Sequence, residues 1–104
     1  MAKVTVNGGA CGFMTQIEAK AERRNTTVTI ETECPALKPM AEELTTVNGF
    51  EECMGKIGDT QVFQIARKYC KHAACPVPTA IIKGIEVANG LALPRTIEMK
   101  ITKE

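Results

Sequence analysis

The sequence contains no serine and no tryptophan, and its one histidine is His72. Without serine, the chain cannot be a serine hydrolase. Aromatic residues make up only 4% of the chain, so it has few side chains on which nucleic-acid bases could stack. Its 13 basic and 12 acidic residues nearly cancel, to a net charge of +1, which argues against a phosphate-binding surface. We therefore expect no nucleic-acid partner.

Long apolar segments and closely paired metal-binding cysteines are also missing. No run of apolar residues reaches the length of a membrane span, and the N-terminal stretch MAKVTVNGG has no apolar core of a signal peptide. We therefore expect a cytoplasmic protein with no membrane partner. No C-x2-C pair occurs, so neither a zinc ribbon nor a ferredoxin-type cluster motif is indicated.

The acidic residues offer no clear catalytic pair. Glu42 and Glu43 are adjacent in the sequence, as are Glu51 and Glu52, and this is typical of solvated surfaces rather than of an acid facing a base. Cysteine-based catalysis would need a histidine, and His72 is the one candidate. Whether the protein is an enzyme stays open, and we expect a carrier or scaffold role rather than a catalytic one.

The sequence does contain enough apolar residues for one core. Its 104 residues, 44% of them hydrophobic, predict a single domain over residues 1–104. Apolar and polar residues alternate in 3–7, 13–22 and 28–34, as they do in strands with one wet face. After a proline, residues 95–103 alternate again, which predicts a final strand with Ile97, Met99 and Ile101 facing inward.

Helical spacing replaces this alternation between residues 35 and 88. Apolar residues recur three and four positions apart in 35–44, 59–70 and 76–88, whereas 45–58 is expected to be a loop with one helical turn. Asn89-Gly90 indicates a helix end, where Leu91 can complete a Schellman motif. This order of segments predicts an α+β fold in two layers, a mostly antiparallel sheet of about four strands with two or three helices packed on one face.

The five cysteines are the most informative residues, because an odd number in a reducing compartment argues against a disulfide framework. Cys11 lies in the glycine-rich turn NGGACGF, between the first two predicted strands. Cys34 ends the third predicted strand and precedes a proline, and Cys75 precedes the proline that begins the last predicted helix. Cys34 and Cys75 therefore have positions like helix N-caps, where free backbone N–H groups favour a thiolate.

If the glycine-rich turn folds toward the two helix starts, Cys11, Cys34 and Cys75 form a three-thiolate site. Thiolates are soft ligands, which suit zinc or an iron–sulfur cluster. Cys70 and His72 are further candidate metal ligands, because Cys70 and Cys75 have C-x4-C spacing with His72 between them. Cysteine is also among the most often buried residues, so Cys53 and Cys70 can equally be core side chains.

Three segments resemble the IscU/NifU-type iron–sulfur cluster scaffold proteins: ACGFMTQIEAKAE, VTIETECPALKPMAEEL and ACPVPTAIIKGIEVA. The resemblance covers residues 4–89 and implies that Cys11, Cys34 and Cys75 take the scaffold's three positions for cluster or zinc ligands. Two positions depart from that pattern, since Phe13 stands where an Asp is usual and Ala74 where a His is frequent. The stretches CPVP and GLALP also suggest that the chain belongs to a small family distinct from these scaffold proteins.

These observations leave three hypotheses about function. The first is a three-cysteine metal or iron–sulfur cluster binding protein, a scaffold or carrier whose partner would be a sulfur donor or an acceptor apoprotein. The second is a thiol redox or sulfur-carrier component, in which one thiolate attacks and another resolves. The third is a small cytoplasmic interaction domain whose cysteines are purely structural. An exposed sheet edge would allow self-association, but the sequence does not specify an oligomeric state.

Overall fold

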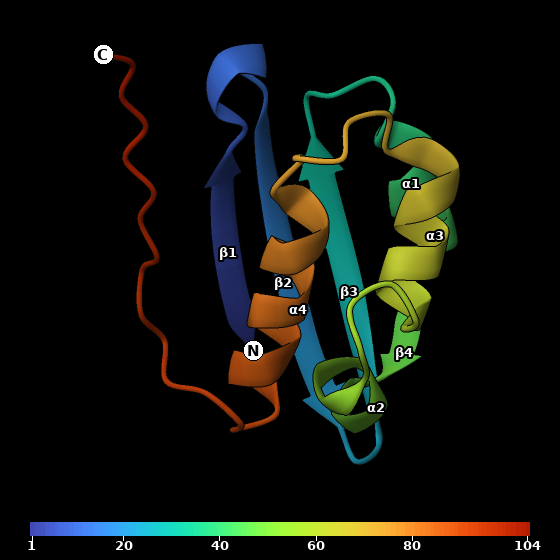
Figure 1. The fold of residues 1–104 in the computed structure, drawn as a ribbon. Coiled ribbons are helices and arrows are strands. Elements are labelled where there is room, and N and C mark those ends of the chain that lie inside the picture. Colours follow the sequence, from blue (N-terminus) through green and yellow to red (C-terminus); the bar gives the residue numbers. More distant parts are fainter.

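A four-stranded antiparallel sheet forms one layer of the molecule, and helices form the other (Figure 1). The computed structural model describes all of residues 1–104. The strands lie in the order β1 (Ala2–Asn7), β2 (Met14–Glu22), β3 (Asn25–Thr32) and β4 (Thr46–Asn48). The helices are the 3-10 turn η1 (Gly9–Cys11), α1 (Lys38–Glu43), α2 (Gly49–Met54), α3 (Gln61–Tyr69) and α4 (Val77–Ala88). The α+β prediction is confirmed, with one more α-helix than expected because part of the predicted loop forms α2.

The fourth strand is not the segment that the sequence indicates. The short strand β4 pairs with the start of β3, where Val47 lies opposite Thr26. Residues 95–103 form no strand within the chain, so that prediction is wrong for the isolated molecule. Three residues are too few to show an alternating pattern, so the sequence predicts a loop over 45–58 where the structure forms β4.

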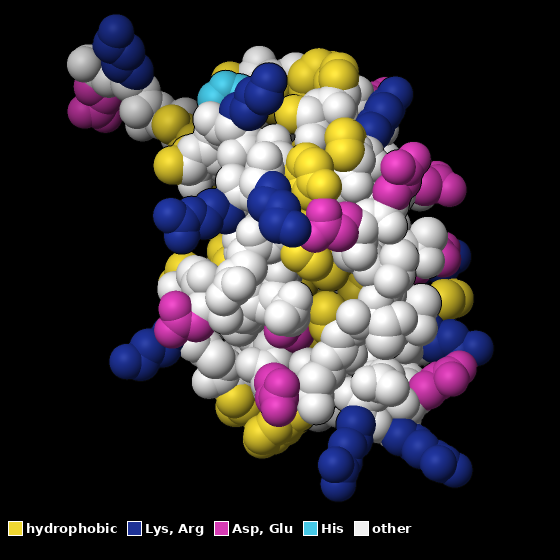
Figure 2. Space-filling model, turned by 90° about the vertical axis from the view of Figure 1, so that its right-hand side faces the viewer, with side chains coloured by type: hydrophobic (Ala, Val, Ile, Leu, Met, Phe, Trp, Pro, Cys, Tyr) yellow, Lys and Arg dark blue, Asp and Glu magenta, His cyan; other side chains and the backbone are white.

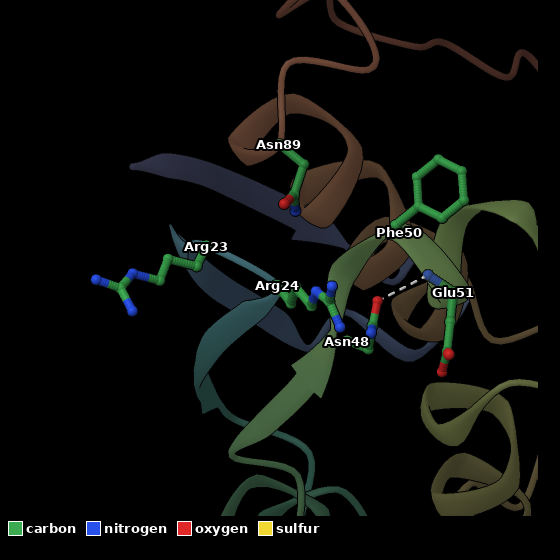
Figure 3. Close-up of a pocket in the computed structure, with 6 residues that line it drawn as sticks. All are labelled: Arg23, Arg24, Asn48, Phe50, Glu51 and Asn89. Carbon is green, nitrogen blue, oxygen red and sulfur yellow. Dashed lines mark hydrogen bonds between the residues drawn. The ribbon is translucent and has the colours of Figure 1, made fainter.

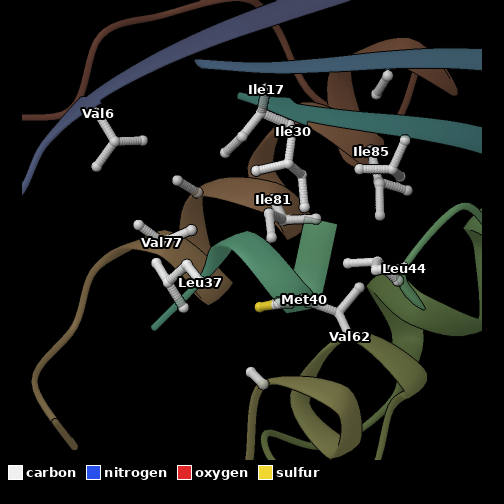
Figure 4. Close-up of a cluster of buried hydrophobic side chains, with 14 of the residues drawn as sticks. Val6, Ile17, Ile30, Leu37, Met40, Leu44, Val62, Val77, Ile81 and Ile85 are labelled. Carbon is white, nitrogen blue, oxygen red and sulfur yellow. The ribbon is translucent and has the colours of Figure 1, made fainter. Parts of the chain in front are cut away.

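Alternation along the long strands places one face of the sheet under the helices. Ile17 on β2 and Ile30 on β3 are buried, whereas the residues between the inward-facing positions of both strands are exposed. Helix α4 packs across β1 and β2, and its Ile81 and Ile85 are fully buried. Figure 4 shows this cluster, which also includes Val6, Leu37, Met40, Leu44, Val62 and Val77.

A buried carboxylate links α2 to α3. The side chain of Glu52 accepts hydrogen bonds from the N–H groups of Gln61 (3.0 Å) and Val62 (2.8 Å). These N–H groups begin α3 and have no partner inside that helix. The interpretation of Glu51-Glu52 as a solvated pair is therefore wrong for Glu52, which is only 5% exposed.

Helix α4 ends in the Schellman motif that the sequence predicts. Gly90 has a φ of 72°, its N–H donates to the Val87 carbonyl (3.1 Å), and the Leu91 N–H donates to the Glu86 carbonyl (2.8 Å). Beyond this motif, the chain extends along the side of the molecule where β1 lies (Figure 1). None of the helices combines the length and the apolar character that a membrane crossing requires.

Candidate functional site: a thiol cluster at one end of the sheet

One end of the sheet collects the loops that carry four of the five cysteines, and we call it the thiol end. Because the strands are antiparallel, β1 and β3 finish at this end and β2 begins there. The turn with Cys11 joins β1 to β2, Cys34 follows β3, and Cys70 and Cys75 bound the loop between α3 and α4. Figure 1 shows these connections close to one another at the top of the molecule.

Cys34 is held by a tight turn rather than by a helix start. Its N–H donates to the hydroxyl of Thr32 (3.1 Å), which shares a further hydrogen bond with the Thr15 hydroxyl (2.8 Å). Its carbonyl accepts from the N–H of Leu37 (3.1 Å), and α1 begins only at Lys38. The prediction of an N-cap position is therefore wrong for Cys34, whose half-buried side chain packs against the core.

A single backbone carbonyl positions both Cys70 and Cys75. The carbonyl of His72 accepts a hydrogen bond from the Cys70 S–H (3.5 Å) and another from the Cys75 N–H (3.1 Å). Cys70 also caps α3, where its N–H donates to the Ala66 carbonyl (2.7 Å). Both cysteines are half-buried against the core. His72 itself is exposed, so its backbone rather than its imidazole organises the loop.

Helix α3, which delivers Cys70 to the thiol end, is tied to α1 by one carboxylate. Glu43 accepts hydrogen bonds from the Lys68 ammonium (2.7 Å) and from the Tyr69 hydroxyl. These two hydrogen bonds, the one from Lys68 first, lower the pKa of Glu43. Because Tyr69 is adjacent to Cys70, the contact also fixes the end of α3 beside the segment that follows Cys34.

The Cys75 thiol is influenced by two other thiols. Its pKa is raised from 9.0 to about 11, chiefly because burial disfavours the thiolate and then because Cys70 and Cys34 lie nearby. The N–H of Val77 acts in the opposite direction but is outweighed. The prediction of an N-cap position is also wrong for Cys75, because Pro76 holds that position at the start of α4, and burial raises the pKa of the thiol rather than lowering it. We call Cys34, Cys70 and Cys75 the three-thiol cluster.

Cys11 lies at the same end of the sheet but is not among the groups that influence Cys75. Its side chain is exposed, and its sulfur rests on Gly8, where an added Cβ would overlap it. Gly9 and Gly12 have φ values of 79° and 73°, which side chains rarely adopt, so these glycines let the turn form. The structure thus places Cys34 and Cys75 near enough for one thiol to influence the other, whereas Cys11 is exposed in the turn between β1 and β2.

The three-thiol cluster is not a preformed metal site. No three His, Cys, Asp or Glu side chains are arranged so that they could hold a metal ion. Joint coordination would require the thiols to move closer and to lose their protons. The segments that carry them are short loops and helix ends, which adjust more easily than the sheet beneath.

Cys53 lies on α2, away from the cluster, and packs against the core. Burial, with smaller contributions from Glu86 and Glu52, raises its pKa to about 11. Cys53 provides a matched control for cysteine substitutions. It is half-buried like Cys75, but no other thiol contributes to its raised pKa.

A cavity of about 370 Å³ lies at the other end of the sheet (Figure 3). Its lining comes from the β2–β3 turn, the start of α2 and the end of α4, and consists of Arg23, Arg24, Asn48, Phe50, Glu51 and Asn89. Sequence reasoning assigned none of these residues to a binding site. Two adjacent arginines in a polar turn match no motif, and only the folded chain places them near Asn89.

The chain matches a family of unknown function (DUF6951) over residues 2–101. It belongs to this family. The matched region includes all five cysteines and most of the extended segment after α4. No curated protein and no solved structure matches the chain.

Proposed function

We propose that this protein binds a soft metal ion or an iron–sulfur cluster through Cys34 and Cys75, with Cys11 as the third ligand and Cys70 as an adjacent one. The observation that carries the proposal is the gathering of thiols from two separate loops, after β3 and before α4, at one end of the sheet. Cys34 and Cys75 are far apart in the sequence, so their proximity is a property of the fold rather than of local geometry.

The electrostatics of the cluster favour a cation. Neighbouring thiols resist joint deprotonation because each negative charge raises the pKa of the others, as Cys34 and Cys70 do for Cys75. A bound soft cation removes this repulsion, since its charge stabilises several thiolates at once. Metal binding should therefore release protons, and its affinity should increase as pH rises.

Cys11 would join the site by reorientation of its turn. The Gly9 and Gly12 positions permit backbone conformations that other residues avoid, and the Cys11 side chain is already exposed. His72, exposed on the loop between Cys70 and Cys75, is a candidate for the remaining position. If the group is an iron–sulfur cluster, a scaffold or carrier role follows, with a sulfur donor or an acceptor apoprotein as partner.

The test is reconstitution of the reduced protein under anaerobic conditions, once with zinc and once with iron and sulfide. Bound zinc is measured by competition with a chromophoric chelator, and a cluster by visible absorption and iron analysis. We expect the wild-type protein to bind, and Cys34→Ser and Cys75→Ser each to weaken zinc affinity more than about tenfold. Cys11→Ser should weaken it too.

Cys53→Ser is the matched control and should bind like the wild type, because Cys53 lies outside the cluster. Binding of neither zinc nor a cluster by the wild-type protein would refute the proposal. Equal losses in Cys53→Ser and Cys75→Ser would refute the assignment of the site, because they would indicate a general effect of cysteine loss on folding.

A second candidate function is thiol–disulfide exchange between Cys70 and Cys75, and their shared hydrogen bonding to the His72 carbonyl favours it. An external disulfide would take two electrons from the pair, leaving as two thiols while Cys70 and Cys75 form one bond. Because the pKa of Cys75 is about 11, the exchange should be slow near neutral pH. Mass spectrometry after treatment with oxidised glutathione would detect a Cys70–Cys75 disulfide, and its absence at equilibrium would exclude this role.

A further inference from the structure

The outer edge of β1 is the unpaired edge of the sheet beside α4. β1 pairs with β2 on one side only, and the strand order places nothing on its other side. Its outward N–H and C=O groups are therefore free to pair with another strand. Proteins commonly shield such edges, because an open edge promotes association between chains.

The segment after α4 is also without a partner. Residues 92–104 form no helix or strand and take part in no backbone hydrogen bond. The segment projects from the body of the molecule (Figures 1 and 2). Its side chains Ile97, Met99 and Ile101 are 60%, 75% and 90% exposed, which is costly for three large apolar residues in one short segment.

The composition of this segment matches the sheet beside it. Ile97, Met99 and Ile101 alternate with Glu98 and Lys100, as buried and exposed residues alternate on β2. The wet face of the sheet carries the same residue types, including the ion pair between Lys3 on β1 and Glu18 on β2. A strand placed beside β1 would therefore add apolar side chains next to α4 and charged side chains beside Lys3.

We propose that residues 95–102 form a fifth strand that pairs with β1 of a second copy of this chain, the two copies exchanging these strands reciprocally. The segment and β1 run in the same direction in one chain (Figure 1), so pairing within a chain would be parallel. All other pairs in this sheet are antiparallel, which is the slightly more stable arrangement. In a partner related by a twofold axis, β1 can run antiparallel to this segment. The reciprocal exchange then adds a fifth strand to the sheet of each copy.

The experiment measures the oligomeric state of the full-length protein by sedimentation velocity over a range of concentrations. We expect a dimer for the wild type and a monomer for the double variant Ile97→Lys/Ile101→Lys, because its lysines cannot be buried beside α4. The matched control is Thr96→Lys/Thr102→Lys, which adds the same charge on the wet side of the strand and should remain dimeric. Circular dichroism confirms that each variant is folded.

A second measurement identifies the strand exchange itself. Equal amounts of isotopically light and heavy protein are unfolded together, refolded, and treated with a lysine-specific crosslinker, and Lys3–Lys100 crosslinks are analysed by mass spectrometry. Exchange between copies predicts that about half of these crosslinks join a light chain to a heavy one. A monomeric wild type, a dimer that survives Ile97→Lys/Ile101→Lys, or crosslinks only within chains of the same label would overturn the proposal.

Discussion

One buried polar side chain caps the start of α3. Both carboxylate oxygens of Glu52 accept hydrogen bonds from backbone N–H groups of that helix. These hydrogen bonds lie in a site that is nearly closed to solvent. Loss of such a charged acceptor leaves buried N–H groups without a partner, which costs more than the loss of a surface hydrogen bond.

We therefore expect Glu52→Ala to lower the free energy of unfolding by about 2–3 kcal/mol, since two N–H groups at the start of α3 lose their acceptor. Urea denaturation followed by circular dichroism measures this change. The adjacent Glu51→Ala is the control and should change stability by less than about 0.5 kcal/mol, because the Glu51 side chain is exposed. Equal effects of the two substitutions would contradict the capping role of Glu52.

The half-buried thiols predict a loss of stability in alkaline solution. The pKa values of Cys53 and Cys75 are raised from 9.0 to about 11 in the folded chain. Each raised value contributes stability that is complete below pH 9.0 and is lost as pH rises through about 11. After solvent screening, we expect a loss on the order of 1 kcal/mol for each thiol.

Urea denaturation at several pH values under reducing conditions measures this loss. The double variant Cys53→Ala/Cys75→Ala is the reference, and its stability should fall less steeply over the same alkaline range. Lysine and tyrosine side chains titrate there too, but they do so in both proteins. The same slope for the two proteins would show that the thiols are not stabilised in their neutral form.

Among the helices, α4 has the closest contact with the sheet. A Cβ added at Gly84 would lie 3.0 Å from the Val4 Cγ2 atom on β1, which is tighter than an ordinary van der Waals contact. Glycine is otherwise unfavourable in the middle of a helix, by about 0.5–1 kcal/mol relative to alanine. The glycine at this position is therefore explained by the approach of α4 to β1.

This contact predicts a non-additive pair of substitutions. Gly84→Ala alone should destabilise the protein by about 1 kcal/mol, because the new methyl group crowds Val4. In the Val4→Ala background the same change should cost nothing or increase stability, since the crowding atom is gone and alanine favours the helix. Chemical denaturation of the four proteins of this cycle measures the coupling, and simple additivity would contradict the proposed packing.

The elements that could be predicted from the sequence are those with a periodic pattern of their own. Alternation identifies β1, β2 and β3, and spacings of three and four identify α3 and α4. The three-residue strand β4 has no such pattern, because its position depends on pairing with β3. The segment 95–103 has the pattern of a strand but no partner within the chain, and this explains why that prediction failed for the isolated molecule.

In the whole molecule, one continuous core lies between the sheet and the helices (Figure 4). Ile81 lies in this core and is fully buried, whereas Ile57, in the loop after α2, is 89% exposed. The two isoleucines thus differ in environment but not in chemistry. Their comparison shows whether the two-layer packing stabilises the protein.

We expect Ile81→Ala to lower the free energy of unfolding by about 2–5 kcal/mol, because it removes buried methyl groups and leaves a cavity. Ile57→Ala should change stability by less than about 0.5 kcal/mol. Thermal and urea denaturation of both variants provide the comparison. A loss at Ile57 as large as that at Ile81 would mean that the loop after α2 is buried in the folded protein.

The candidate site was only partly predictable from the sequence. The sequence placed Cys34 and Cys75 at the ends of elements and named Cys70 as a further candidate ligand, and the structure places these three thiols at one end of the sheet, with Cys11 exposed in the turn between β1 and β2. Helix-end chemistry also predicted a thiolate at Cys75, where burial instead raises the pKa of the thiol. Burial depends on every element that packs around a residue, so local sequence cannot determine a pKa of this kind.

The sequence by itself determined the periodic strands and helices, the single α+β core and the helix end at Gly90, because these follow from spacing and backbone preference within a few residues. The tertiary structure alone decided that Glu52 is buried, that β4 completes the sheet, and that Cys34, Cys70 and Cys75 form one cluster. Each of these depends on contacts between separate helices, strands and loops. Such contacts form when the layers pack together, and no local pattern encodes them.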